Sequence, residues 1–419
     1  MDFTPSAISS EYRSKVADFI AKEIEPVEAD YLRTLRSLDD PWVVLPVIEE
    51  LKAKAREQGL WNFFLPKAFS EASGHGAGMS NVDYAPLAEL MGRHFIAPEV
   101  FNCNAPDTGN AEVLVHYGSE AQQRQWLEPL LAGEIRSAFC MTEPEVASSD
   151  ATNMAATAVL DGDEVVVNGR KWFSTGVGHP NCEFVIFMGL TDPEAHRHAR
   201  HSMVIVPIGT PGFTVERMLP VFGFHDEPFG HGEVTFDNVR VPKENVIAGL
   251  GRGFEIAQGR LGPGRIHHCM RLIGLAERAL ELGIERGMGR SAFGKPLVNL
   301  GGNRERIARA RIAINQARLL VHHTAWLLDT HGAFGALSEL SQIKAVVPAM
   351  AESVIDLAIQ LHGAGGLTDD FPLAGAFTGA RSLRLVDGPD EVHLGVVARI
   401  ELAPYKQGAD HNGHHERQA

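Results

Sequence analysis

The sequence of 419 residues is poor in cysteine and has no long apolar run. The four cysteines, Cys103, Cys140, Cys182 and Cys269, are scattered, and no two have the C-x-x-C spacing of a redox or metal site. Scattered thiols in so long a chain indicate a reducing compartment and exclude a disulfide scaffold. Because no apolar run reaches about 18 residues, we expect no membrane span. The N-terminus is polar and lacks the apolar region of a signal peptide, so we expect the cytoplasm of a bacterium or, in a eukaryote, an organelle matrix.

Basic residues are also scarce, with 38 Lys and Arg against 53 Asp and Glu and a formal net charge of −15. This acidity argues against a nucleic-acid partner and against a polybasic membrane anchor. It does not exclude an anionic small molecule, because one or two local arginines are enough to hold a phosphate. The content of 44% hydrophobic and 22% charged residues is that of a globular protein, and the length allows two or three domains.

The spacing of apolar residues changes twice along the chain, which divides it into three segments. We predict that each segment is one domain. Residues 1–136 and 251–406 carry apolar residues three to four apart, which indicates helices. Residues 137–250 alternate with a period of two, which indicates strands. We expect an α+β protein that is mostly α, with an N-terminal helical domain, a middle antiparallel β-barrel or sandwich and a C-terminal four-helix bundle. Residues 407–419 form a polar tail.

The same periods predict the individual elements. Helices are expected at 12–24, 45–58, 82–95, 119–131, 266–288, 304–328, 337–362 and 390–402. Strands are expected at 155–160, 165–167, 184–190, 202–207, 213–219 and 232–241. Asp161-Gly162-Asp163 and Asn168-Gly169 are both hairpin signals. Strands and helices do not alternate, which disfavours a Rossmann fold.

Two further patterns have ordinary structural interpretations. Residues 249–253 resemble a dinucleotide loop, but the apolar stretch before them is short and no parallel strand follows, so we expect a turn before a helix. His267-His268 and His322-His323 lie in helical patterns. Adjacent helical residues point about 100° apart, so neither pair can offer both rings to one metal. We expect core or interface histidines and no metal site.

Three segments carry side chains suited to chemistry. Residues 139–150 bring hydroxyls and small residues together, either as a polar loop or as a nest that binds a phosphate or the polar edge of a ring. Residues 171–176 set Trp172 beside hydroxyls, which suits a flat heteroaromatic ring or plain core packing. Asp390 and Glu391 fit a helix start, and Asp387 precedes them on a loop.

Together these segments resemble the acyl-CoA dehydrogenase family of flavoproteins over nearly the whole chain. Four motifs occur in the family's order: Thr142-Glu143-Pro144 to Ser149-Asp150, Trp172-Phe173-Ser174, the R-x-x-F-G-x-P-L pattern at 290–297 and the Q-x-x-G-G-x-G pattern at 360–366. Single positions depart from these patterns, as where Ala364 replaces the second glycine of the last motif. The long form of the first motif and residues 386–393 resemble the branch that contains family members ten and eleven.

The resemblance implies an FAD cofactor and assigns its contacts by position. They are Phe139, Met141, Thr142, Ser148, Ser149, Trp172, Phe173, Ser174, Arg290, Phe293, Gln360, His362, Gly363, Ala364, Pro389 and Glu391. The CoA substrate would contact Ser149, Gly262, Pro263, Gly264, Arg265 and Gly388, with residues 262–264 as a turn. In the family the contacts near 290 and 360 cross a subunit interface, which implies a homodimer or a homotetramer built as a dimer of dimers.

The resemblance also makes Asp387 the catalytic base. Most of the family has a glutamate at this place, and the aspartate is one methylene shorter, which reduces its reach by about 1.5 Å. A second subgroup supplies its glutamate directly before an arginine, and that place is Gly264 here, before Arg265. Asp387 would remove the α-proton of an acyl-CoA while the β-carbon delivers a hydride to flavin N5, and the product would be a trans-2-enoyl-CoA. The thioester carbonyl would be polarised by a flavin ribityl hydroxyl and by the backbone N–H of the base.

Electrons would then pass to an electron-transfer flavoprotein, in fatty-acid β-oxidation or related acyl catabolism. The alternative within the fold is an oxidase that uses O₂, either an acyl-CoA oxidase or a nitroalkane-oxidase-like enzyme, and an aspartate base occurs there too. A non-catalytic flavin-binding scaffold would need a dead base, which an ionisable Asp387 disfavours.

Overall fold

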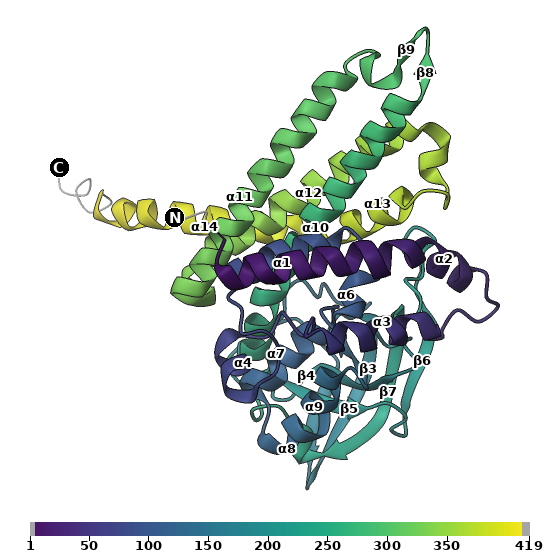
Figure 1. Cartoon of the computed structure of the whole chain (residues 1–419). Coiled ribbons are helices and arrows are strands. Elements are labelled where there is room, and N and C mark those ends of the chain that lie inside the picture. Colours follow the sequence, from purple (N-terminus) through teal and green to yellow (C-terminus); the bar gives the residue numbers. More distant parts are fainter. Residues whose placement is uncertain (1–4, 413–419) are drawn as a thin grey trace, which may run out of the picture. The chain divides into compact units, whose positions relative to one another are not determined.

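The computed structural model describes residues 5–412, apart from the side chains of residues 261–263 and 406–412. The chain divides into two compact units, Met1–Gly264 and Arg265–Ala419. Figure 1 follows it from purple helices through teal strands to green and yellow helices, which confirms the predicted α–β–α order and the mostly helical α+β class. The predicted domain boundaries near residues 136 and 250 stay a prediction.

The first part of the chain is helical, as expected. Its elements are α1 (Ala7–Phe19), the π-helical η1 (Ile20–Ile24), α2 (Glu25–Arg36), α3 (Pro46–Glu57), α4 (Lys67–Ser73), α5 (Asn81–Gly92), α6 (Ala97–Val100), α7 (Asp107–Tyr117), α8 (Glu120–Gln122), η2 (Gln123–Leu127) and α9 (Glu128–Ala132). The sequence missed α7, because every residue from Asp107 to Leu114 is buried and polar and apolar side chains alternate without a stripe. Two further short helices, α4 and α6, lie between the segments expected as helices.

A seven-stranded sheet follows, with the order β1-β4-β2-β3-β7-β6 and with β5 paired to β4. Its strands are β1 (Arg136–Cys140), β2 (Thr157–Asp161), β3 (Glu164–Thr175), β4 (Cys182–Leu190), β5 (His201–Pro207), β6 (Phe213–Met218) and β7 (His231–Pro242). The prediction of an antiparallel sheet is confirmed for four pairs. It is wrong for β4, which pairs in parallel with β1 and, through Leu190 and Thr157, with β2. The chain leaves β1 by a long loop and reaches β4 only after β2 and β3. The sheet is therefore mixed.

The two predicted hairpin signals have different outcomes. The turn at Gly162 joins β2 and β3, with the glycine at φ +63°. Asn168-Gly169 makes no hairpin and instead forms a bulge inside β3, where the register with β7 shifts between Val167 and Gly169. A Cβ at Gly169 would lie 2.4 Å from the Cβ of Ala156, so the glycine serves a close approach of two backbones.

The last part of the chain forms the predicted helix bundle. Its elements are α10 (Gly253–Gly289), the short strands β8 (Ser291–Ala292) and β9 (Lys295–Pro296), η4 (Leu297–Asn299), α11 (Asn303–Gly335), α12 (Leu337–His362), η5 (Gly363–Leu367), α13 (Leu373–Ser382) and α14 (Asp390–Asn412). Within the second unit, α11, α13 and α14 pack against α12. Because α14 continues to Asn412, the predicted tail begins inside this helix, and residues 413–419 lie outside the described residues. None of the described helices has the length and apolarity that a membrane crossing requires.

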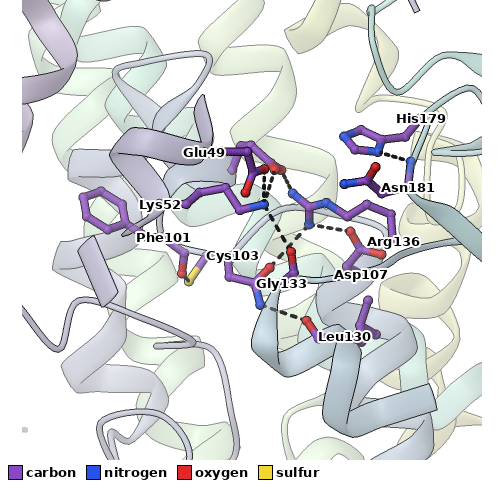
Figure 2. Close-up of polar contacts among 12 residues, drawn as sticks. Glu49, Lys52, Phe101, Cys103, Asp107, Leu130, Gly133, Arg136, His179 and Asn181 are labelled. Atoms are coloured by element: carbon purple, nitrogen blue, oxygen red, sulfur yellow. Dashed lines mark hydrogen bonds and ion pairs between the residues drawn. The ribbon is translucent and has the colours of Figure 1, made fainter. Parts of the chain in front are cut away.

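A buried network of charges attaches β1 to the helices of the first unit (Figure 2). Arg136 on β1 is 2% exposed and pairs with Glu99 on α6 and, at 2.8 Å, with Asp107 on α7. The second oxygen of Asp107 accepts hydrogen bonds from the N–H and the hydroxyl of Ser137, at 2.8 and 2.6 Å. Buried Lys52 on α3 lies 3.7 Å from Glu99 and extends the network. The strand that leads into residues 141–150 is thus fixed at its start.

We predict that Arg136→Met lowers the free energy of unfolding by about 3–5 kcal/mol, because it leaves buried Asp107 without its ion-pair partner and Glu99 with only the more distant Lys52. The control is Arg33→Met, which breaks an ion pair with Asp30 whose side chains are both mostly exposed. That change is expected to cost about 0–1 kcal/mol. Urea unfolding followed by circular dichroism measures both, and equal effects would contradict the prediction.

Candidate active site

In the first unit, the predicted flavin loop is fixed by a buried lysine. The Lys171 ammonium on β3 donates to the carbonyl oxygens of Met141 and Met188, at 2.9 and 2.7 Å, and to the Glu143 carboxylate at 2.7 Å. Glu143 in turn accepts the backbone N–H groups of residues 155 and 156, at 2.9 and 3.1 Å. Burial lowers the pKa of Lys171, and the Glu143 charge opposes that shift. Glu143 lies in the first family motif and Lys171 in the segment 171–176, but no pattern in the sequence predicts that the two side chains pair.

The predicted residues of β3 lie directly beside this loop. The Trp172 N–H donates to the Thr142 carbonyl at 3.0 Å, so the two segments run side by side. A register shift between Lys171 and Ser174 marks a bulge, and Phe173 there has φ +49°. The Phe173 ring packs against the Trp172 indole at 5.1 Å and is exposed, whereas Ser174 is buried. The bulge thus presents two aromatic rings at one place.

Two buried polar atoms at this place have no hydrogen-bond partner among the described residues. They are the hydroxyl of Ser174 and the indole nitrogen of Trp172, which is a donor only. Leaving a buried donor unsatisfied costs about 1–3 kcal/mol, so such an atom needs an explanation. An acceptor on the edge of a flat ring seated against these aromatics would satisfy it. The residues present therefore fit a flavin.

The other predicted residues of the first unit have more varied surroundings. The Ser148 hydroxyl accepts from the Glu143 N–H at 2.8 Å and donates within the loop, so it stabilises the loop itself. Ser149 is exposed. The Phe139 ring lies under the Arg260 guanidinium, whose central carbon is 3.9 Å from the ring centre. Residues 262–264, expected as a turn, belong to helix α10, and the side chains at 262 and 263 lie outside the described part of the chain.

In the second unit, the remaining predicted flavin contacts lie toward one end of the helix pair α10 and α12. Gly283 lets α10 approach α12 closely, since an added Cβ would lie 3.2 Å from the Cα of Ala358, and Gly287 leaves room for Val298 in η4, whose side chain would lie 2.7 Å from an added Cβ. The β8–β9 hairpin with Arg290 and Phe293 follows α10, and residues 360–364 end α12. Phe293 has φ +52° and is 94% exposed, and Gln360, Gly363 and Ala364 are exposed as well. The His362 ring turns inward instead and packs against Phe371 at 4.6 Å.

Asp387 lies on the loop between α13 and α14, where many contacts fix its backbone. It has φ +57°, and Gly388 has φ +104°. Its carbonyl oxygen accepts from Arg265 Nε at 3.1 Å and faces His393 Nε2 at 3.2 Å. The Lys344 ammonium on α12 donates to the carbonyl of Val386, at 2.7 Å, and also to that of Leu383. Three elements of the second unit thus hold this loop.

The charges around Asp387 are mostly cationic. Burial lowers the pKa of both Arg265 and Lys344, and the Asp387 charge opposes that change in each. Burial, followed by the nearby Arg265 and Lys344 charges, lowers the pKa of His393 to about 4. His393 is therefore neutral near pH 7, and its Nε2 carries the proton that it donates to the Asp387 carbonyl. The Asp387 side chain is 13% exposed, with a carboxylate oxygen 3.5 Å from His268 Nε2.

The other predicted residues near Asp387 lie at the start of α14. Asp390 begins the helix, as expected, and binds Arg384 at 2.7 Å. Pro389 accepts the N–H of Val392 at 3.0 Å, and Glu391 is exposed in the first turn.

Comparison with known proteins gives the same family along the whole chain. Residues 8–134, 138–239 and 251–402 match the models for the N-terminal, middle and C-terminal domains of acyl-CoA dehydrogenase. Probable acyl-CoA dehydrogenase FadE2 of Mycobacterium tuberculosis is 50% identical over 97% of this chain and 98% of its own length. The chain therefore belongs to the acyl-CoA dehydrogenase family of FAD-dependent oxidoreductases. FAD is its cofactor.

The relatives also support the branch. Acyl-CoA dehydrogenase family member 10 of Mus musculus is 54% identical over 95% of this chain, which spans 38% of that protein. Family member 11 of Homo sapiens is 49% identical over 96% of the chain, which spans 51% of it. A solved structure from Mycobacterium abscessus is 67% identical, with a TM-score of 0.92 over 96% of this chain and 100% of that one. The chain thus spans 38% and 51% of these two animal relatives and nearly all of the mycobacterial ones.

We predict that Gly388→Ala destabilises the protein and displaces the Asp387 loop. An added Cβ would lie 2.9 Å from His393 Nε2, on a backbone at φ +104° that alanine adopts only with strain. The expected loss is about 1–3 kcal/mol in thermal unfolding. The matched control is Gly395→Ala in α14, where nothing lies within 4 Å. Alanine there should be neutral or stabilising by up to about 1 kcal/mol, and a loss as large as that of Gly388→Ala would contradict the prediction.

Proposed function

We propose that this chain catalyses the α,β-dehydrogenation of an acyl-CoA thioester to a trans-2-enoyl-CoA, with Asp387 as the general base. The main support for this assignment is the Asp387 loop. Its carboxylate is mostly buried, and its backbone is fixed by Arg265, Lys344 and His393. Cations around a buried carboxylate favour its ionised form, and a base must be ionised before it can accept a proton.

Relatives support the substrate class. The solved butyryl-CoA dehydrogenase of Megasphaera elsdenii is 26% identical, with a TM-score of 0.79 over 96% of this chain and 100% of that one. A glutaryl-CoA dehydrogenase in complex with glutaryl-CoA is 25% identical, with a TM-score of 0.80 over 96% of this chain and 97% of that one. Because the two names carry different acyl groups, they support an acyl-CoA thioester and leave its chain length open.

The chain's residues have separate roles in this reaction. Asp387 takes the α-proton onto a carboxylate oxygen, and its backbone N–H donates to the thioester carbonyl, where negative charge develops. Arg265, which holds the Asp387 carbonyl, and Gly388, which permits the turn, keep that N–H in place. Bound FAD would supply the hydride acceptor, and loss of the α-proton and the β-hydride would leave a C=C bond between the two carbons. No other residue of the proposal changes its protonation state.

The first unit supplies contacts to the flavin ring through Met141, Thr142, Trp172, Phe173 and Ser174. Arg290, Phe293 and residues 360–364 bind the cofactor of a partner subunit, which makes the protein a homodimer or a homotetramer. The nearly full exposure of Phe293 supports this, because an aromatic ring on a hairpin tip gains nothing in water. The assembled cofactor site then needs at least two chains.

We predict that Asp387→Asn lowers the rate of flavin reduction by about 10²–10⁴-fold, because an amide cannot accept the α-proton. Asp387→Glu keeps a carboxylate but displaces it by a methylene, and its rate should fall by about 10–100-fold. Anaerobic bleaching of the flavin absorbance by a panel of acyl-CoAs measures each variant. Normal bleaching by Asp387→Asn, at unchanged FAD content, would refute the assignment.

A second prediction concerns the Trp172 indole. Trp172→Phe keeps an aromatic ring and removes the donor, so FAD affinity should fall by about 0.5–1.5 kcal/mol, the net value of one hydrogen bond. Quenching of flavin fluorescence on titration of the apoprotein gives the Kd. The control, Trp61→Phe, loses an indole bond of 2.8 Å to the Leu131 carbonyl. It should lower stability and leave the FAD Kd unchanged, and the reverse pattern would contradict the assignment.

We further propose that the electrons pass from the reduced enzyme to an electron-transfer flavoprotein. The reaction would then belong to fatty-acid β-oxidation or related acyl catabolism. The four cysteines are buried and form no disulfide, which supports a reducing compartment such as the bacterial cytoplasm. Under air, the reduced enzyme should reoxidise slowly. Rapid O₂ consumption with stoichiometric peroxide would favour the oxidase alternative instead.

A further inference from the structure

His268 lies one turn along α10 from Arg265, with its ring between a guanidinium and the proposed base. One Arg271 nitrogen lies 3.1 Å from His268 Nδ1. Arginine is only a donor, so Nδ1 accepts this bond and the imidazole proton resides on Nε2. The same Nε2 faces a carboxylate oxygen of Asp387 at 3.5 Å. The His268 ring thus lies between Arg271 and Asp387, with Nδ1 as the acceptor from Arg271 and Nε2 as the nitrogen that faces Asp387.

We propose that His268 is a positioning residue for the base: its Nε2–H holds one oxygen of the Asp387 carboxylate, and Arg271 keeps the proton on Nε2 by donating to Nδ1. The inference rests on the proposed function of Asp387 and adds to it. The distance of 3.5 Å is long for a hydrogen bond, as is common for catalytic contacts before substrate binds.

The arrangement meets a need of this chain in particular. Arg265, His393 and Lys344 fix the backbone around Asp387 through carbonyl oxygens, whereas His268 Nε2 lies beside an oxygen of the carboxylate itself. A donor on one carboxylate oxygen selects one orientation and leaves the other oxygen for the α-proton. A side chain one methylene shorter than glutamate has less freedom to find that orientation by itself, so a fixed donor matters more.

The titratable and charged groups facing Asp387 come from three helices. α10 contributes Arg265, His268 and Cys269, with Arg271 behind His268, while α12 contributes Lys344 and α14 contributes His393 and Asp390. Burial raises the pKa of Cys269 to about 12, and that of His393 is lowered to about 4, so neither changes charge between pH 5 and 9. A donor to the ionised carboxylate stabilises it, so removing the donor moves the rate–pH midpoint upward.

The test uses purified holoenzyme and the rate of anaerobic flavin bleaching by a saturating straight-chain acyl-CoA, from pH 5 to 9. His268→Leu should move the midpoint up by about one pH unit and lower the plateau rate about tenfold. His268→Gln, which restores an N–H donor, should recover part of both. Arg271→Met should shift the midpoint in the same direction, Arg271→Lys less, and the double variant His268→Leu/Arg271→Met no further than His268→Leu alone.

A second measurement reads the tautomer without activity or cofactor. In apoprotein labelled with ¹⁵N-histidine, the His268 ring should be protonated at Nε2 in the wild type and lose that preference in Arg271→Met. A wild-type ring protonated at Nδ1 would overturn the proposal. So would a midpoint in His268→Leu equal to that of the wild type.

The matched control is His267→Leu. This neighbour is buried in the core, and burial lowers its pKa to about 3. Its loss should lower the melting temperature without moving the midpoint, which separates damage to α10 from an effect on the base. Should His268→Leu lose its flavin, His268→Asn provides a polar side chain too short for the contact, with the same expected shift. Bleaching that persists in Asp387→Asn would refute the proposed function itself, whereas a normal His268→Leu beside an inactive Asp387→Asn would refute only this inference.

Discussion

The buried guanidinium of Arg136 must be neutralised where it lies, and the first unit is arranged around that requirement. A charge removed from water is tolerated only when opposite charges and hydrogen bonds surround it. Glu99, Asp107 and the neighbouring Ser137 come from two helices and a strand, so neutralising the charge also fixes where β1 begins. The loop that follows β1 inherits that position. A second buried ion pair, between Lys171 and Glu143, lies beyond the other end of β1. The two sets of buried charges together fix the position of the proposed flavin-binding residues.

In the second unit, buried cations are bound by uncharged backbone carbonyls instead of by carboxylates. Arg265 and Lys344 are cations, yet both bind backbone carbonyls of the Asp387 loop, and neutral His393 does the same. Their positive field still acts on Asp387, but their bonds leave its carboxylate available. The same cationic side chains thus fix the backbone of the Asp387 loop and favour the ionised form of its carboxylate, while their hydrogen bonds go to carbonyl oxygens.

Local patterns in the sequence predicted most of the helices and strands, and failures occurred where tertiary contacts decide. Asn168-Gly169 has the residues of a hairpin turn, but the approach of Ala156 makes it a bulge. Helix α7 escaped detection because its buried face carries Asp107, Asn110 and Glu112 rather than an apolar stripe. His267-His268 was expected to be a core or interface pair. The structure separates the two, since residues 100° apart on a helix meet different surroundings: one ring enters the core and the other faces Asp387. Only knowledge of what packs against α10 could have distinguished them.

The left-handed backbone at Asp387 has a consequence for how the enzyme could accommodate different substrates. In an aspartate side chain the staggered torsion χ1 places the carboxylate carbon, and only the broad torsion χ2 turns the oxygens, so on a fixed backbone the carboxylate has only a few positions. Conformational adaptation during turnover must then come from the ligand, which has to bring its own carbon to a nearly stationary acceptor. Differences among acyl groups would accordingly appear as differences in how often each adopts a reactive pose, with the basicity of the acceptor unchanged.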